Sequence, residues 1–143
     1  MMILLDTNVV SETMRNAPCP DVIGWLDAQP LETLYLCAVT VAELRAGVEL
    51  LPAGKRRTAL NEDLEERALP VFGGRVIPFD MNCTRAYAKL LPKVRAAGRQ
   101  VETADGFIAA IALTYGFTVA TRDITPFKAA GVPVINPWQA APG

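Results

Sequence analysis

Four acidic residues stand at places in the chain where carboxylates could act together on one ligand. Asp6 and Asp123 each come at the end of a short apolar run that is typical of a buried strand. Glu43 and Asp105 each come near the start of a segment with helical spacing of apolar residues. Carboxylates in close proximity oppose folding unless a cation or a shared proton compensates, and an all-oxygen cluster suits Mg²⁺ or Mn²⁺. Such a cluster could lower the pKa of a metal-bound water for attack on a phosphodiester.

The composition of the 143-residue chain narrows this chemistry further. It contains no histidine, which excludes a Ser-His-Asp triad and the usual catalytic zinc sites. The three cysteines, Cys19, Cys37 and Cys83, have no C-x-x-C spacing, and we expect reduced, mostly buried thiols. The net charge of −1 gives no general attraction to nucleic acid. An enzyme of this composition would depend on carboxylates, hydroxyls, amides, Lys, Arg or a hard metal ion.

Each acid also has a purely structural explanation. Asp6 and Asp123 could cap the turns that follow their strands. Glu43 could close a capping box that begins at Thr40, and Asp105 could simply face the positive end of a helix dipole. Each explanation stays open for a single acid, whereas the four acids together favour a shared site.

Strands and helices alternate along the chain, which favours a single α/β domain with a central parallel sheet of about five strands. The first strand is apolar on both faces and should lie in the middle of the sheet. Pro78 cannot donate a ladder hydrogen bond, so its strand should lie at an edge. We predict strands over 1–5, 34–39, 76–79, 117–121 and 132–135, and helices over 9–15, 21–28, 40–51, 55–69, 82–97 (with a kink or break at Pro92), 103–115 and about 124–130.

This topology predicts where the four acids lie. Parallel strands end at the same edge of a sheet, so Asp6 and Asp123 should share that edge, where open α/β sheets bind ligands. Glu43 and Asp105 should lie in the first turns of helices that start from the same edge. We therefore expect the four carboxylates to converge.

Four sequence blocks in this order resemble PIN-domain ribonucleases, and more closely the toxin component of VapBC and FitAB type toxin–antitoxin modules. The resemblance covers nearly the whole chain and implies a PIN domain over 1–137 with a C-terminal tail over 138–143. The blocks are Asp6-Thr7-Asn8 after its strand, Val39-Thr40-Val41-Ala42-Glu43-Leu44-Arg45-Ala46-Gly47, Ala104-Asp105-Gly106-Phe107-Ile108-Ala109-Ala110-Ile111-Ala112 and Val119-Ala120-Thr121-Arg122-Asp123, followed by the closing Val134-Ile135-Asn136-Pro137-Trp138.

The resemblance implies a Mg²⁺- or Mn²⁺-dependent endoribonuclease that hydrolyses single-stranded or looped RNA. The family often has asparagine in place of the last acid, so a contact through water is the alternative to direct ligation there. Asn8 and Thr121 match polar positions that line the site, and Arg45 and Arg122, near site residues in sequence, are candidates for phosphate contact or for surface ion pairs. The implied catalytic and metal-binding residues are Asp6, Glu43, Asp105 and Asp123.

The resemblance also implies partners: a cognate antitoxin that lies across helical grooves, operator DNA reached only through that antitoxin, and a second copy in a homodimer. The sequence contains no apolar run long enough for a membrane span and no secretory signal, so we expect a cytoplasmic protein. Six apolar positions could form the antitoxin groove, although a buried core position is the alternative for each: Val9, Val10, Met14, Val48, Leu50 and Leu51.

Two other functions are compatible with an acid cluster. A phosphohydrolase could use Asp6 as a nucleophile, but its usual Asp-x-Asp signature is interrupted here by Asn8. A receiver-like module could bind Mg²⁺ without catalysis, but no lysine stands at the end of a predicted strand before the last helix.

Overall fold

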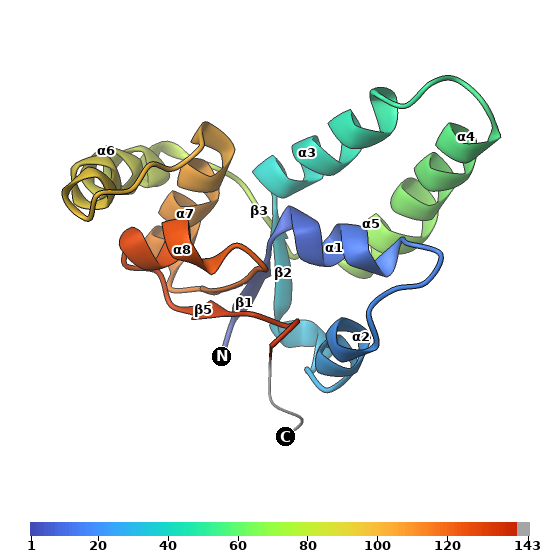
Figure 1. The fold of residues 1–143 in the computed structure, drawn as a ribbon, viewed down its shortest axis with the longest axis horizontal. Coiled ribbons are helices and arrows are strands. Elements are labelled where there is room, and N and C mark those ends of the chain that lie inside the picture. The colour runs from blue at the N-terminus through green and yellow to red at the C-terminus, as the bar shows by residue number, and fades with distance from the viewer. Residues whose placement is uncertain (140–143) are drawn as a thin grey trace.

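A five-stranded parallel sheet forms the centre of the computed structural model, which describes residues 1–139 (Figure 1). The strand order is β3-β2-β1-β4-β5, and every neighbouring pair is parallel. The predicted fold class, the central first strand and the edge strand before Pro78 are therefore confirmed. The strands are β1 (Ile3–Leu5), β2 (Leu34–Cys37), β3 (Val76–Ile77), β4 (Thr118–Ala120) and β5 (Val134–Ile135).

The chain winds outward from β1 in two directions. It passes first to β2 and β3 on one side of β1, and later to β4 and β5 on the other. The order therefore reverses between β1 and β4, the kind of point at which doubly wound sheets bind ligands beyond the strand ends.

Helices cover both faces of the sheet. In Figure 1, α6, α7 and α8 lie together on one side of β1, while α1 to α4 lie on the other. Within residues 1–139, none of them is long and apolar enough to cross a membrane. The helices are α1 (Thr7–Thr13), α2 (Pro20–Asp27), α3 (Ala38–Glu49), α4 (Lys55–Glu62), α5 (Leu69–Val71), α6 (Met81–Ala96), α7 (Thr103–Tyr115) and α8 (Ile124–Ala129), with a 3₁₀ turn η1 (Leu31–Thr33) and a π-helical segment η2 (Asp63–Ala68).

Two hydrophobic clusters hold these layers together. Leu4 packs in the cluster beneath α6, α7 and α8, whereas Ile3 and Leu5 pack in the cluster beneath α1, α3 and η2. Side chains of a strand alternate between its two faces, and both faces of β1 are covered. This explains why the chain begins with an uninterrupted apolar run.

Several local predictions can be compared with the structure. Asp80 caps α6 by accepting a hydrogen bond from the Cys83 amide, and Gly116 ends α7 in the left-handed conformation (φ 74°). Pro92 does not break α6, because buried Leu90 and Val94 on either side of it pack in the same cluster as α7.

The cysteine prediction is confirmed: all three thiols are free, and two of them are buried. Trp138, the first residue of the predicted C-terminal tail, packs against the second hydrophobic cluster. Residues 140–143 of that tail lie outside the described residues.

Candidate active site

Asp6 lies at the reversal point of the sheet, directly after β1. Its amide donates to the Ala120 carbonyl at the end of β4 (2.9 Å). The side chain is only 4% exposed, and both carboxylate oxygens accept a hydrogen bond, from the Thr7 amide and from the Thr121 hydroxyl (2.8 Å each). Burial raises the pKa of Asp6, and the charges of Glu43 and Asp123 add to this, while the two hydrogen bonds oppose it. Asp6 is thus both the N-cap of α1 and a fixed member of the predicted site.

Thr121 connects the residues that follow β1 to those that follow β4. Its side chain is fully buried, and its hydroxyl accepts from the Asn8 amide group (3.3 Å) and from the Asp123 backbone amide (3.1 Å). The single hydroxyl proton therefore points to Asp6. Asn8 completes the network by accepting from the Arg122 backbone amide (3.3 Å).

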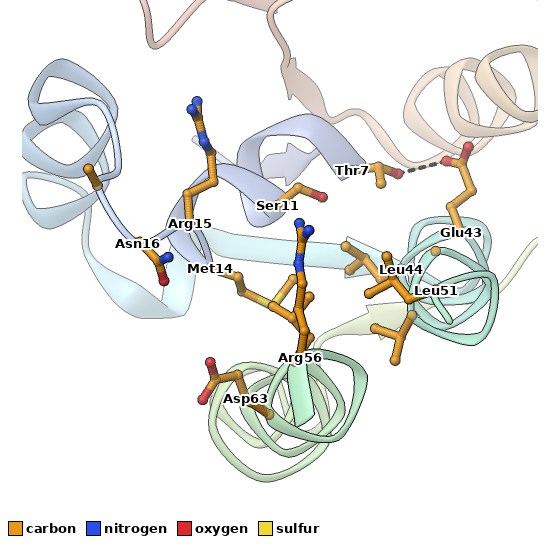
Figure 2. Close-up of a pocket in the computed structure, with 15 residues that line it drawn as sticks. Thr7, Ser11, Met14, Arg15, Asn16, Glu43, Leu44, Leu51, Arg56 and Asp63 are labelled. Carbon is orange, nitrogen blue, oxygen red and sulfur yellow. Dashed lines mark hydrogen bonds between the residues drawn. The ribbon is translucent and has the colours of Figure 1, made fainter. Parts of the chain in front are cut away.

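Glu43 enters the site from α3, and the capping-box explanation for it is wrong. The helix begins at Ala38, after N-cap Cys37, so Thr40 lies inside the first turn, where its hydroxyl contacts the Cys37 sulfur at 3.4 Å. Glu43 therefore lies in the second turn and not the first, and its Oε1 accepts a hydrogen bond from the Thr7 hydroxyl (2.7 Å; Figure 2).

Thr7 is the site residue that the predicted site set omits. Its backbone amide binds Asp6 and its hydroxyl binds Glu43, so one residue joins the acid after β1 to the acid on α3. The Asp-Thr-Asn triplet after the first strand is the sequence signal for it, but that signal is equally compatible with a turn role for Thr7.

Asp105 lies in the first turn of α7 and is partly buried. Burial, followed by the charges of Asp6, Glu43, Asp123 and Glu102, raises the pKa of Asp105 to about 7. Among the described residues, no hydrogen bond to the Asp105 side chain appears as a cause that opposes this shift. The predicted acids are therefore close enough to act on one another electrostatically, and Glu102 joins them.

Asp123 is exposed and precedes α8, but its side chain makes no capping hydrogen bond. The turn-capping explanation therefore does not apply to it in this structure. Only its backbone amide is tied into the site, through Thr121.

The donor atoms at this edge fit a hard divalent cation, because all the acids present oxygen and no histidine or thiolate competes with them. As the side chains are placed, residues 1–139 contain no group of three or more acidic, cysteine or histidine side chains that could hold a metal ion. Mg²⁺ in proteins is often bound by one or two carboxylates together with waters and substrate phosphates. The residues therefore fit such an ion as partial ligands and not as a complete protein cage.

The two predicted phosphate-binding arginines both have partners within the protein. Arg45 pairs with Glu65 through two hydrogen bonds (2.8 and 3.0 Å). The guanidinium of Arg122 lies over the ring of Trp138, 5.1 Å from its centroid, and the side chain remains exposed.

Two hollows open on either side of the acids. The first, a groove of about 940 Å³ between α1, α3 and α4, has Thr7 and Glu43 at one end and Arg56 and Asp63 further along (Figure 2). The second, of about 750 Å³, is lined by residues 98–102, by Asp105 and by Asp123.

The predicted antitoxin-groove residues divide into three groups. Met14, Val48 and Leu51 line the first groove. Val9 and Val10 are buried in the second hydrophobic cluster instead, and Leu50 is 85% exposed and lies outside the groove lining. Helical spacing alone could not separate these neighbouring faces of α1 and α3.

Comparison with known proteins places the chain in a family. The chain is 66% identical over 139 residues to the plasmid stability protein StbB of Pseudomonas syringae pv. tomato, covering 97% of this chain and 100% of that protein. It is 53% identical over 140 residues to the VapC ribonuclease Y4jK of Sinorhizobium fredii, covering 98% and 100%. The crystal structure of FitAcB from Neisseria gonorrhoeae has a TM-score of 0.92 at 50% identity, covering 97% of this chain and 100% of that one. Residues 3–132 match the model of the PIN domain, and the chain therefore belongs to the PIN domain family.

Proposed function

We propose that the protein is a Mg²⁺- or Mn²⁺-dependent endoribonuclease and the toxin of a toxin–antitoxin pair that acts in the cytoplasm. The observation that carries the proposal is the negative charge gathered around Asp105, which makes no hydrogen bond to offset it. The anionic backbone of RNA would be repelled from this edge without a divalent cation. The similarity to a VapC ribonuclease supports the same activity.

The position of each acid suggests its role in the reaction. Asp6 and Asp105 would hold the cation, and Asp123, exposed at the rim, would bind it directly or through water. A bound cation would neutralise the cluster and lower the pKa of a bound water. Glu43 has one oxygen bound to Thr7, which leaves the other available to accept the proton of the attacking water.

The roles of the polar and basic residues around the acids follow from how far each side chain is buried. Thr121 is fully buried, so we assign it to orienting Asp6 instead of touching RNA. Asn8 is partly exposed and could contact the substrate directly. Arg99, which lines the second hollow, and Arg122, which precedes Asp123 in the chain, are both exposed and would bind phosphates flanking the cut. Arg45 could do so only by leaving its ion pair with Glu65.

The first groove is the proposed docking place for an antitoxin segment. It combines an apolar lining with the basic side chains of Arg15 and Arg56, and it ends at Glu43, so a bound segment would obstruct the site. Operator DNA would be reached through that antitoxin, and a second copy of the chain would form the homodimer.

The test is cleavage of a total-RNA sample by antitoxin-free protein with Mg²⁺, with Mn²⁺ and with EDTA. Asp105→Ala is the inactivating variant, and Asp27→Ala, at an exposed acid on α2, is the matched control. We expect metal-dependent fragments from the wild type and from Asp27→Ala, and none from Asp105→Ala. Fragments that persist in EDTA would refute the metal-dependent mechanism. Binding of Mg²⁺ without cleavage would favour a non-catalytic binding module.

A further inference from the structure

The ring of Trp138 is the platform on which the side chain of Arg122 rests. The Arg122 guanidinium carbon lies 5.1 Å from the ring centroid, a distance at which a cation is attracted to the face of an indole. Trp138 itself is partly buried and packs against the second hydrophobic cluster. The platform is therefore fixed to the core, while the arginine it supports lies between Thr121 and Asp123.

The backbone brings Trp138 to this place in two steps. β5 pairs with β4, and the Thr121 amide donates to the Ile135 carbonyl (3.0 Å), so the end of β5 lies beside the loop that carries Asp123. The chain then turns at Asn136, whose side-chain oxygen accepts from the Trp138 amide (2.9 Å).

Arg122 also interacts with the residues that follow β1. Its backbone amide binds Asn8, which in turn binds the Thr121 hydroxyl. The positive charge of Arg122 also helps to keep the pKa of buried Glu12 low, after the larger contributions from the Cys19 amide and from Arg15. The Arg122 side chain thus contacts a ring on the C-terminal segment, and its charge also acts on a carboxylate of α1.

We infer that Trp138 is a positioning residue for RNA cleavage: it holds Arg122, and through Arg122 it holds the Thr121–Asp123 loop that orients Asp6. This inference rests on the proposed function. Without the indole ring, the Arg122 side chain loses this contact and becomes more mobile. The loop is then held in place by its hydrogen bonds to Asp6 and Asn8 without this contact. Loss of a cation–π contact at an exposed site corresponds to about a 2- to 5-fold change in rate or affinity.

The kinetic test compares Trp138→Ala with a matched control at the other tryptophan. Trp25 is also partly buried against the second hydrophobic cluster but makes no contact with Arg122, so Trp25→Ala removes a similar apolar group elsewhere. We expect Trp138→Ala to lower kcat by about 2- to 5-fold and to raise KM as well, because Arg122 is also a proposed phosphate contact, and we expect Trp25→Ala to leave both unchanged. Trp138→Phe, which keeps a ring face, should recover most of the activity.

A double-mutant cycle separates positioning from general stability. If Trp138 acts through Arg122, Trp138→Ala should have almost no additional effect on kcat in an Arg122→Ala background. Fully additive effects, or equal losses in Trp138→Ala and Trp25→Ala, would overturn the inference.

A readout without RNA distinguishes this inference from the proposed function. In Trp25→Phe the only remaining tryptophan is Trp138, so its emission reports on the contact. Adding Arg122→Ala should shift that emission in the metal-free protein, and Trp138→Ala should weaken Mn²⁺ binding measured by calorimetry by about 2- to 5-fold. If the emission did not shift, the Arg122–Trp138 contact would be absent and the inference would be wrong. Absence of cleavage by the wild type would instead refute the proposed function.

Discussion

Asp6 and Asp105 face the same edge of the sheet, but they are held in different ways. Asp6 follows a central strand, is 4% exposed, and has both oxygens bound by neighbours. Asp105 lies in the first turn of α7, is partly exposed, and has its pKa raised by burial and by the charges of neighbouring carboxylates. One acid is therefore oriented by the fold itself, and the other is left with charge that the fold does not neutralise.

Without the proposed cation, one half of the candidate site is therefore already ordered and the other half is not. The residues after β1 and β4 form a connected hydrogen-bond network, in which the orientation needed for chemistry is already present. Under the proposed function, the acid on α7 completes the site only when a cation compensates the repulsion between the carboxylates. Variants of the two halves should therefore differ in stability even where they agree in activity.

The largest expected effect is the loss of cleavage in Asp6→Ala and Asp105→Ala, at least about 1,000-fold in each, because both remove a proposed metal ligand. Stability should separate the two. Asp6→Ala leaves the Thr7 amide and the buried Thr121 hydroxyl without an acceptor and should cost about 1 kcal/mol. Asp105→Ala should raise metal-free stability. Urea unfolding in EDTA measures the free energy of unfolding of both variants. If this free energy rose in both variants, or fell in both, the proposed difference between Asp6 and Asp105 would be wrong.

Thr121→Val tests the network from its centre. It keeps the shape of the side chain but leaves the Asp6 carboxylate, the Asn8 side-chain amide and the Asp123 backbone amide each without one hydrogen-bond partner. We expect cleavage to fall about 10- to 100-fold and the free energy of unfolding to fall by about 1 to 3 kcal/mol. Thr121→Ser, which restores the hydroxyl, is the control and should retain most activity.

Thr7→Val tests the link between the two halves. The backbone hydrogen bond to Asp6 remains, but Glu43 loses the partner of its Oε1. Cleavage should fall by about tenfold, with little change in stability, and Thr7→Ser should behave like the wild type. Unchanged kinetics in Thr7→Val would show that Glu43 does not need this hydrogen bond.

The smallest expected effect is the pH dependence of metal-free stability. The pKa of Asp105 rises from 3.8 to about 7 on folding, so the folded protein binds more protons than the unfolded chain between these values. Stability should therefore fall as pH rises through this window and become level above it. We expect about 1 kcal/mol once solvent screening of this partly exposed group is allowed for. Asp105→Asn should flatten the dependence measured by thermal unfolding in EDTA.

The sequence was informative where one strand or one helix determines the answer. The apolar run before Asp6 predicted a central strand, and the common direction of parallel strands predicted that Asp6 and Asp123 share an edge. These inferences need only the period of side chains and the topology of the sheet.

The sequence was less informative where two distant segments meet. The Thr7–Glu43 hydrogen bond, the Arg45–Glu65 ion pair and the position of Trp138 beneath Arg122 depend on how helices and strands pack. Likewise, the start of α3 at Ala38 was missed because Thr40 and Glu43 match a capping box locally, whereas the tertiary structure places Glu43 against α1.

The hydrogen bond from Thr121 to Asp6 joins residues 115 positions apart in the chain. Because proteins are synthesised from the N-terminus, Asp6 leaves the ribosome long before the hydroxyl that orients it. A growing chain therefore carries the first acid of the site without the strand, loop and threonine that make it useful. Under the proposed function, the nuclease becomes competent only late in its own synthesis, which gives an antitoxin time to be present before the first active molecule exists.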